Sequence, residues 1–237
     1  EVLVKLFEAG LDAVRCNFSH GTADDHRNRV KLIRDVAEKN GFKVGVLGDL
    51  QGPKIRIARF KEKKVMLTKG QEFVLDAEMD LDSGDDKRVG IDYKTLPDEV
   101  KSGDILLLDD GKIVFQVKGI DGKKVICEVT VAGPLSNNKG INKQGGGLSA
   151  KALTEKDKED LITAAEIGVN FLALSFVRNA EDMHEARALL DAQGAHHIGI
   201  IAKIERLEAL DHIDEIIEAG DGVMVARGDL AVEIGPE

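Results

Sequence analysis

Amphipathic helices and short apolar strands alternate over the first 50 residues. We expect a helix from Thr22 to about Asn40, because Thr22 and Asp25 have the spacing of a capping box and apolar residues recur every three or four positions. The apolar segments at 12–19 and 43–50 flank this helix and are predicted to be strands. The N-terminal part of the chain therefore reads as strand, helix, strand.

The same alternation resumes after residue 150. The apolar spacing, with Thr154 as an N-cap and Gly168 as a helix end, predicts three more helices and three more strands. In chain order these are a helix at 154–168, a strand at 171–176, a helix at 181–194, a strand at 198–205, a helix at 209–220 and a strand at 222–229. Apolar strands separated by amphipathic helices are typical of a helix-covered parallel sheet. The fold class is α/β, and both a (β/α) barrel and a doubly wound sheet fit.

The pattern changes between about residues 57 and 148, where short alternating runs broken by Gly and Asp predict an all-β insertion. The sequence DDGK at 109–112 indicates a hairpin. The return segment at 137–149 contains three consecutive glycines and is either a flexible strap for a lid or a plain linker. We therefore divide the chain into a first barrel-type part at 1–54, a β-rich domain at 55–148 and a second barrel-type part at 149–237.

Composition and charge narrow the possible partners. The chain has 237 residues, 43% hydrophobic and 32% charged, as expected of a globular protein. Its net charge of −10 argues against nucleic acid or an anionic membrane as a partner. Cys16 and Cys127 lack the spacing of a disulfide framework or a zinc site, which favours a reducing, cytoplasmic location. No apolar run reaches the roughly 20 residues of a membrane span.

Polar and charged residues gather where five of the predicted strands end. In parallel α/β folds this edge of the sheet binds ligands, because the loops converge there. The residues are Arg15, Asn17 and Ser19, then Asp49, Ser175, Lys203 and Glu205, and finally Arg227 and Asp229. Since five strands share the feature, we expect the functional site at this edge.

Two of these strands carry charged residues that could bind a cation. Lys203 and Glu205 are two residues apart on one strand, so their side chains share a face. A structural ion pair is one interpretation. If Asp229 ends the next strand, however, its carboxylate approaches Glu205, and two such carboxylates either repel or share a cation such as Mg²⁺. Gly228 would let a substrate approach the backbone closely.

Basic and neutral polar groups complete the candidate site. Arg15 carries a guanidinium suited to phosphate, and Asn17 and Ser19 add neutral oxygens, or else line the core. Arg56 and Lys139 lie near the two junctions of the insertion, where they could meet a polyphosphate or remain solvated charges. The P-loop, GxGxxG and GxSxG motifs are absent from the sequence.

Six segments in this order resemble the pyruvate kinase family: RCNFSHG, LGDLQGPKIR, NNKGIN, LALSF, IIAKIE and MVARGDL. The resemblance covers all 237 residues. It implies a partial (β/α)8 TIM barrel, the A domain, interrupted by an all-β lid, the B domain. It also implies phosphoryl transfer from phosphoenolpyruvate to ADP in glycolysis, giving pyruvate and ATP, by a cytoplasmic homo-oligomer that is a tetramer in the family.

The resemblance also implies roles for individual residues. Lys203 would be the catalytic lysine, which stabilises the transferring phosphoryl group and the enolate. Glu205 and Asp229 would bind Mg²⁺ or Mn²⁺. The substrate would contact Arg15, Lys203, Gly228 and Asp229. The nucleotide would contact Asn17, Phe18, Ser19, His20, Arg56 and Lys139. Monovalent-cation ligands would be Asn17, Ser19, Asp49 and the carbonyl of Leu50.

The chain departs from the family pattern in three respects. Lys54 stands where many members have glutamate, so we expect its ammonium to replace the charge of K⁺ and make K⁺ dispensable. Ala231 replaces a common glycine, which predicts a tighter loop near the substrate. Family strands precede Glu1 and follow Glu237, so we expect the chain to be a fragment that is inactive alone. The alternatives are another Mg²⁺-dependent barrel enzyme acting on phosphoenolpyruvate or pyruvate, and a noncatalytic β-domain binding module.

Overall fold

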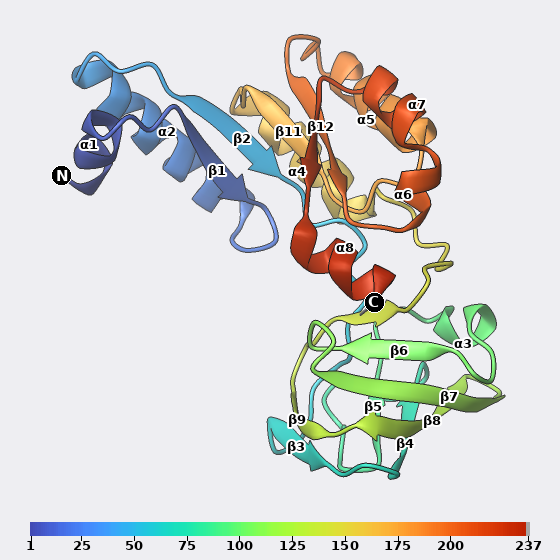
Figure 1. Cartoon of the computed structure of the whole chain (residues 1–237). Coiled ribbons are helices and arrows are strands. Elements are labelled where there is room, and N and C mark those ends of the chain that lie inside the picture. The colour runs from blue at the N-terminus through green and yellow to red at the C-terminus, as the bar shows by residue number, and fades with distance from the viewer. Residues whose placement is uncertain (236–237) are drawn as a thin grey trace. The chain divides into compact units, whose positions relative to one another are not determined.

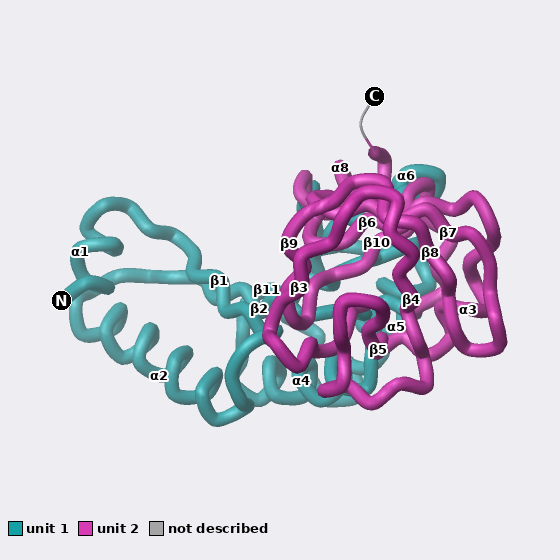
Figure 2. Tube along the Cα trace, turned by 90° about the horizontal axis from the view of Figure 1, so that it is seen from below, with its two compact units in different colours: residues 1–53, 151–226 teal, residues 54–150, 227–237 magenta. Residues whose placement is uncertain are grey.

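The computed structural model describes residues 1–235, which form two compact units (Figures 1 and 2). Unit 1 contains residues 1–53 and 151–226. Unit 2 contains residues 54–150 together with the described residues after 226. The chain therefore leaves unit 1, returns to it, and ends in unit 2.

Unit 1 is built on a parallel sheet of five strands in the order β1-β2-β11-β12-β13. The strands are β1 (Ala13–Asn17), β2 (Gly45–Asp49), β11 (Phe171–Leu174), β12 (Gly199–Ile204) and β13 (Gly222–Val225). Their order in space follows their order along the chain, without the reversal that marks a doubly wound sheet. The sheet is therefore that of a half barrel, and the mixed α/β class predicted from the sequence is confirmed.

The helices of unit 1 include those predicted at 22–40, 154–168 and 181–194. They are α1 (Val2–Glu8), α2 (Ala23–Lys39), α4 (Glu155–Glu166), α5 (Ala180–Ala192), α6 (Glu208–Asp211) and α7 (Ile213–Ala219). The predicted capping box of Thr22 and Asp25 opens α2, and an equivalent box of Thr154 and Asp157 opens α4. The single helix predicted at 209–220 is wrong, because His212 adopts φ −115° and ψ 15° and separates α6 from α7.

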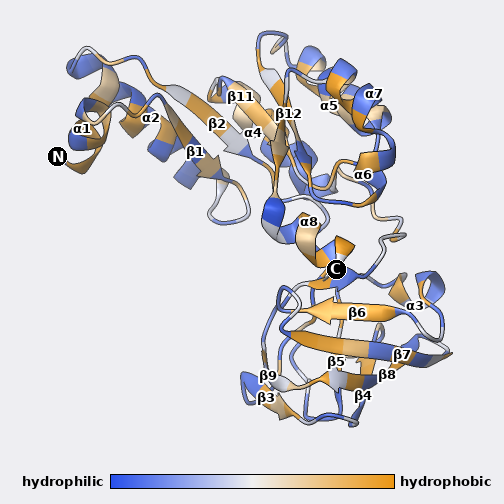
Figure 3. Ribbon diagram, in the orientation of Figure 1, coloured by the Kyte–Doolittle hydropathy of each residue, from blue (hydrophilic) through white to orange (hydrophobic). Residues whose placement is uncertain are grey.

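Unit 2 contains a six-stranded sheet in the order β10-β6-β7-β8-β4-β5 and a two-stranded sheet of β3 and β9. The strands are β3 (Lys64–Leu67), β4 (Glu72–Asp76), β5 (Arg88–Gly90), β6 (Ile105–Leu108), β7 (Ile113–Asp121), β8 (Lys124–Val131), β9 (Gly133–Ser136) and β10 (Ile141–Lys143). Figure 3 shows the strongly apolar character of β6, whose residues contribute to a core that includes the rings of Phe73 and Phe115, 5.4 Å apart. The insertion is not purely β, because it contains a short helix, α3 (Leu96–Glu99). Its first two residues, Leu96 and Pro97, are buried.

The hairpin predicted at DDGK is confirmed between β6 and β7. Asp109, Asp110 and Gly111 all have positive φ, at 50°, 57° and 83°. Aspartate and glycine tolerate this left-handed region better than most residues, so the sequence suits the turn.

The C-terminal segment differs from the prediction. The strand expected at 222–229 ends with β13 at Val225, and α8 (Arg227–Ile234) begins directly afterwards. Asp229 lies in the first turn of α8, where a carboxylate is stabilised by the helix dipole. Arg227, Gly228 and Asp229 are thus helical residues of unit 2 and do not end a strand. None of the helices within residues 1–235 has the length and apolar character needed to cross a membrane.

Candidate active site

Lys203 is the centre of a polar cluster at the carboxyl ends of the strands in unit 1. Its Nζ lies 2.9 Å from Glu205 Oε1 and 3.3 Å from Asp49 Oδ1, and it donates a hydrogen bond of 2.7 Å to Ser175 Oγ. Both carboxylate side chains are 2% exposed, and that of Lys203 is 12% exposed. The predicted placement of Lys203 and Glu205 on one face is confirmed.

Asp49 links this cluster to the first strand. Its Oδ2 accepts a hydrogen bond of 2.5 Å from Arg15 Nε. The two residues lie on the paired strands β1 and β2, where Asn17 is the register partner of Asp49. Asp49 and Glu205 are therefore matched by the cations Arg15 and Lys203, which offsets the cost of burying the carboxylates. More than half of the Arg15 side chain is exposed, so its guanidinium can still reach a ligand.

Ser175 and Phe176 form the turn that follows β11. Ser175 Oγ donates a hydrogen bond of 2.8 Å to the carbonyl of Leu50, and the amide of Phe176 donates one of 2.8 Å to Glu205 Oε2. The sequence marked Ser175 only as a polar residue at a strand end, and it gave no sign of the contact made by the Phe176 amide. Both contacts depend on chain segments that are distant in sequence.

The predicted residues from Asn17 to His20 lie at the end of β1 and in the turn that follows it. Asn17 Oδ1 accepts a hydrogen bond of 2.9 Å from the amide of Ser19, which lies beyond the end of the strand. Ser19 is partly buried and His20 is exposed. The ring of Phe18 is fully buried and stacks on His26, with centroids 4.0 Å apart and planes 13° apart. Any contact between Phe18 and a nucleotide must therefore use its backbone.

Arg56 and Lys139 lie on adjacent chain segments of unit 2, and their side chains have different partners. An antiparallel bridge pairs Arg56 with Gly140, and the Arg56 guanidinium donates a hydrogen bond of 3.0 Å to the carbonyl of Asn138. Lys139 Nζ lies 2.8 Å from Asp109 Oδ1. The hydrogen bond from Lys139 holds the pKa of Asp109 below its usual range. The sequence did not indicate this pairing of Lys139 with the hairpin turn.

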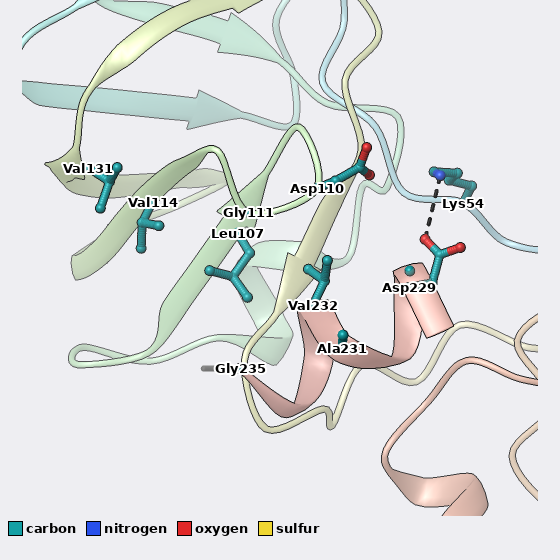
Figure 4. Close-up of a pocket in the computed structure, with 11 residues that line it drawn as sticks. Lys54, Leu107, Asp110, Gly111, Val114, Val131, Asp229, Ala231, Val232 and Gly235 are labelled. Atoms are coloured by element: carbon teal, nitrogen blue, oxygen red, sulfur yellow. Dashed lines mark ion pairs between the residues drawn. The ribbon is translucent and has the colours of Figure 1, made fainter. Parts of the chain in front are cut away.

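Lys54 pairs with Asp229 within unit 2. Their Nζ and Oδ1 atoms are 3.7 Å apart, and Figure 4 shows the two side chains facing one another at a pocket that is also lined by Asp110 and by apolar residues such as Leu107 and Val232. Asp229 and Glu205 belong to different units, so their joint binding of one cation remains a prediction.

Comparison with known families decides the identity of the chain. Residues 1–237 match the family model described as pyruvate kinase, barrel domain. The chain belongs to the pyruvate kinase family. It is 57% identical over 236 residues to pyruvate kinase of Haemophilus influenzae and to pyruvate kinase II of Salmonella typhimurium, and 50% identical over 236 residues to pyruvate kinase of Buchnera aphidicola. These alignments cover 98% of this chain and 49% of each relative, so the chain spans about half the length of the curated relatives it matches.

The donor atoms of this chain suit the cations that the pyruvate kinase family generally uses. Glu205 and Asp229 provide carboxylates, the preferred protein ligands of Mg²⁺. Asp49 is 1% exposed, and within residues 1–235 its Oδ1 atom accepts no hydrogen bond, although it lies 3.3 Å from the Lys203 ammonium. This oxygen and the side chain of Asn17 provide hard oxygen donors suited to a monovalent cation. Within the same described residues, no group of three or more His, Cys, Asp or Glu side chains could hold a metal ion.

Proposed function

We propose that the intact protein is a pyruvate kinase, which transfers the phosphoryl group of phosphoenolpyruvate to ADP and yields pyruvate and ATP. The observation that carries this proposal is the position of Lys203, held by Asp49, Glu205 and Ser175 at the carboxyl ends of parallel strands in a chain of this family. Phosphoryl transfer depends mainly on positioning and on neutralising the charge of the transferring group. A fixed, mostly buried ammonium supplies both.

The substrate would be held by groups with complementary charge. Lys203 stabilises the transferring phosphoryl group and the developing enolate. Arg15 contacts the phosphate through the exposed part of its guanidinium. The backbone of Gly228 and Asp229 receives the substrate carboxylate. A Cβ on Gly228 would meet no atom within 4 Å, so the space beside this backbone is open.

The nucleotide would be held from two parts of the sequence. Arg56 and Lys139 contact its phosphates from unit 2, where the bridge between Arg56 and Gly140 places the two residues on adjacent chain segments. The end of β1 supplies Asn17, and the turn after it supplies Ser19, His20 and the backbone of Phe18. The β-rich domain at 55–148 acts as a lid that excludes water and strengthens the electrostatic interactions of the site.

Two kinds of cation are proposed for the intact enzyme. Glu205 and Asp229 hold Mg²⁺ or Mn²⁺, which neutralises phosphate charge when it is bound. Asn17, Ser19, Asp49 and the Leu50 carbonyl hold a monovalent cation. Lys54 supplies a permanent positive charge beside Asp229, which supports activity that is largely independent of K⁺.

A coupled assay tests the proposal. The intact protein is mixed with phosphoenolpyruvate, ADP and Mg²⁺, and pyruvate formation is followed with lactate dehydrogenase and NADH. Pyruvate formation that requires ADP is expected, and no turnover refutes the proposal. Turnover without nucleotide identifies another phosphoenolpyruvate or pyruvate enzyme. Binding of Mg·ADP without turnover, insensitive to Lys203→Ala, identifies a noncatalytic binding module.

The 237-residue chain is expected to be inactive alone. Its parallel sheet is open, with β1 and β13 as edge strands. The chain spans about half the length of its relatives. The same assay on this chain is expected to show no pyruvate formation, and measurable turnover contradicts the expectation.

The intact protein is further proposed to be a cytoplasmic homo-oligomer with four subunits. Light scattering can determine its mass and so test the tetramer.

A further inference from the structure

Ser175 makes contacts on both sides within the sheet of unit 1. It follows β11, which lies between β2 and β12. Its hydroxyl accepts a hydrogen bond from Lys203 Nζ and donates one to the carbonyl of Leu50, at 2.7 Å and 2.8 Å. The residue is only 2% exposed, so solvent competes little for these bonds. One hydroxyl thus connects the proposed catalytic lysine to a proposed cation ligand.

The backbone around Ser175 is held in an unusual conformation. Phe176 has φ 57°, in the left-handed region that bulky residues rarely occupy. Such strain persists only where the surrounding structure enforces it, and it concentrates at functional sites. Here the conformation aims the Phe176 amide at Glu205 Oε2, while the ring lies 5.8 Å from the Arg206 guanidinium.

Gly52 allows this turn to pack closely against the segment that follows β2. A Cβ on Gly52 would lie 2.8 Å from Ser175 Cβ and 2.9 Å from Phe176 Cδ2, closer than real contacts permit. The amide of Gly52 is in turn fixed by a hydrogen bond of 3.0 Å to the buried Asp157. The turn is therefore clamped on one side by Gly52 and on the other by β12.

We propose that Ser175 is a positioning residue, which fixes the ammonium of Lys203 in the one place where it can meet the transferring phosphoryl group. The inference rests on the proposed pyruvate kinase function. Lysine carries its charge on a flexible four-carbon stem, and Asp49 and Glu205 attract that charge from two sides. The neutral oxygen of Ser175 supplies a third, directional contact that selects one position between them. In this role the Ser175 hydroxyl takes no part in making or breaking bonds. It affects the reaction only by holding Lys203.

The test is a double-mutant cycle in the intact protein. Ser175→Ala is expected to lower kcat by about 10- to 100-fold, the usual effect of losing a residue that orients a site ligand, while KM for phosphoenolpyruvate and ADP changes by less than about 3-fold. In a Lys203→Ala background the same substitution is expected to change kcat by less than about 3-fold, because the group that it positions is gone. Thr163→Val is the control, since it removes another buried hydroxyl, on α4, and should leave kcat unchanged.

The outcomes separate this inference from the proposed function. An inactive wild-type protein contradicts the proposed function itself. If the wild type is active and Ser175→Ala has the same kcat, only the role of Ser175 is overturned. The same holds if Ser175→Ala lowers kcat equally in the wild-type and Lys203→Ala backgrounds. If circular dichroism shows that Ser175→Ala does not fold, Ser175→Cys replaces it in the same cycle, because it keeps a weakly hydrogen-bonding group of similar size.

Discussion

Lys203 Nζ lies 3.3 Å from Asp49 Oδ1, although their strands, β12 and β2, are separated in the sheet by β11. The lysine side chain therefore reaches across the end of β11, where Ser175 accepts its hydrogen bond. Through Asp49 the interaction continues to Arg15 on β1. Four strands of the half barrel thus contribute to one charged cluster.

Removal of the Asp49 charge should destabilise the protein. Asp49→Asn leaves Arg15 and Lys203 without a buried carboxylate that both contact, so we expect the free energy of unfolding to fall by about 3 kcal/mol. Urea unfolding of the intact protein measures the effect. Asp35→Asn is the control, because Asp35 pairs with Lys31 on the exposed face of α2, and its loss should cost less than about 0.5 kcal/mol. Equal losses for the two variants would show that the Asp49 cluster is not stabilising.

His26 should make the stability depend on pH. Its ring is 1% exposed, and within residues 1–235 neither ring nitrogen has a hydrogen-bond partner. Burial, followed by the charges of Arg29 and Lys156, lowers the pKa of His26, against the opposing charges of Asp160 and Asp25. As the pH falls, His26 is therefore protonated first in the unfolded state, near the ordinary histidine pKa of about 6.5. The contribution of neutral His26 is complete above that pH and is lost as the pH falls toward the lower, folded-state pKa.

The variant His26→Phe should remove this dependence. Phenylalanine can keep the stacking on Phe18 and cannot be protonated. Below pH 6.5 the free energy of unfolding of the variant should fall less steeply with pH than that of the wild type, by up to about 1.4 kcal/mol per pH unit. Urea unfolding across the acidic range measures this slope. The exposed His184→Gln substitution should leave the wild-type dependence unchanged. An unchanged slope in His26→Phe would assign the acid sensitivity to other groups.

The sequence predicted much of the sheet and its helices because their signals are local. The capping box at Thr22, the N-cap at Thr154 and the alternation that places Lys203 beside Glu205 all depend on residues within three positions of one another. The contacts that the sequence did not predict join distant segments. Periodicity cannot show that Lys203 reaches over β11. The early start of α8 was missed because the apolar strand pattern leads directly into its first turn.

Lys54 should determine the response to K⁺. Lys54→Glu replaces a cation by an anion 3.7 Å from Asp229, so we expect turnover in K⁺-free buffer to fall by roughly 10-fold or more and to be restored by added K⁺. Lys118→Glu, the same charge change on β7, serves as the control. A wild-type enzyme that strongly requires K⁺, with no change in Lys54→Glu, would refute this role.

The most direct measurement is the ADP-dependent formation of pyruvate from phosphoenolpyruvate by the intact wild type and its Lys203→Ala variant, assayed side by side with Mg²⁺. The wild type should turn over, and loss of the ammonium should lower kcat by about 100- to 1000-fold, as expected for a group that stabilises charge in the transition state. A wild type without turnover, or a variant as active as the wild type, would contradict the assignment of this cluster as a pyruvate kinase active site.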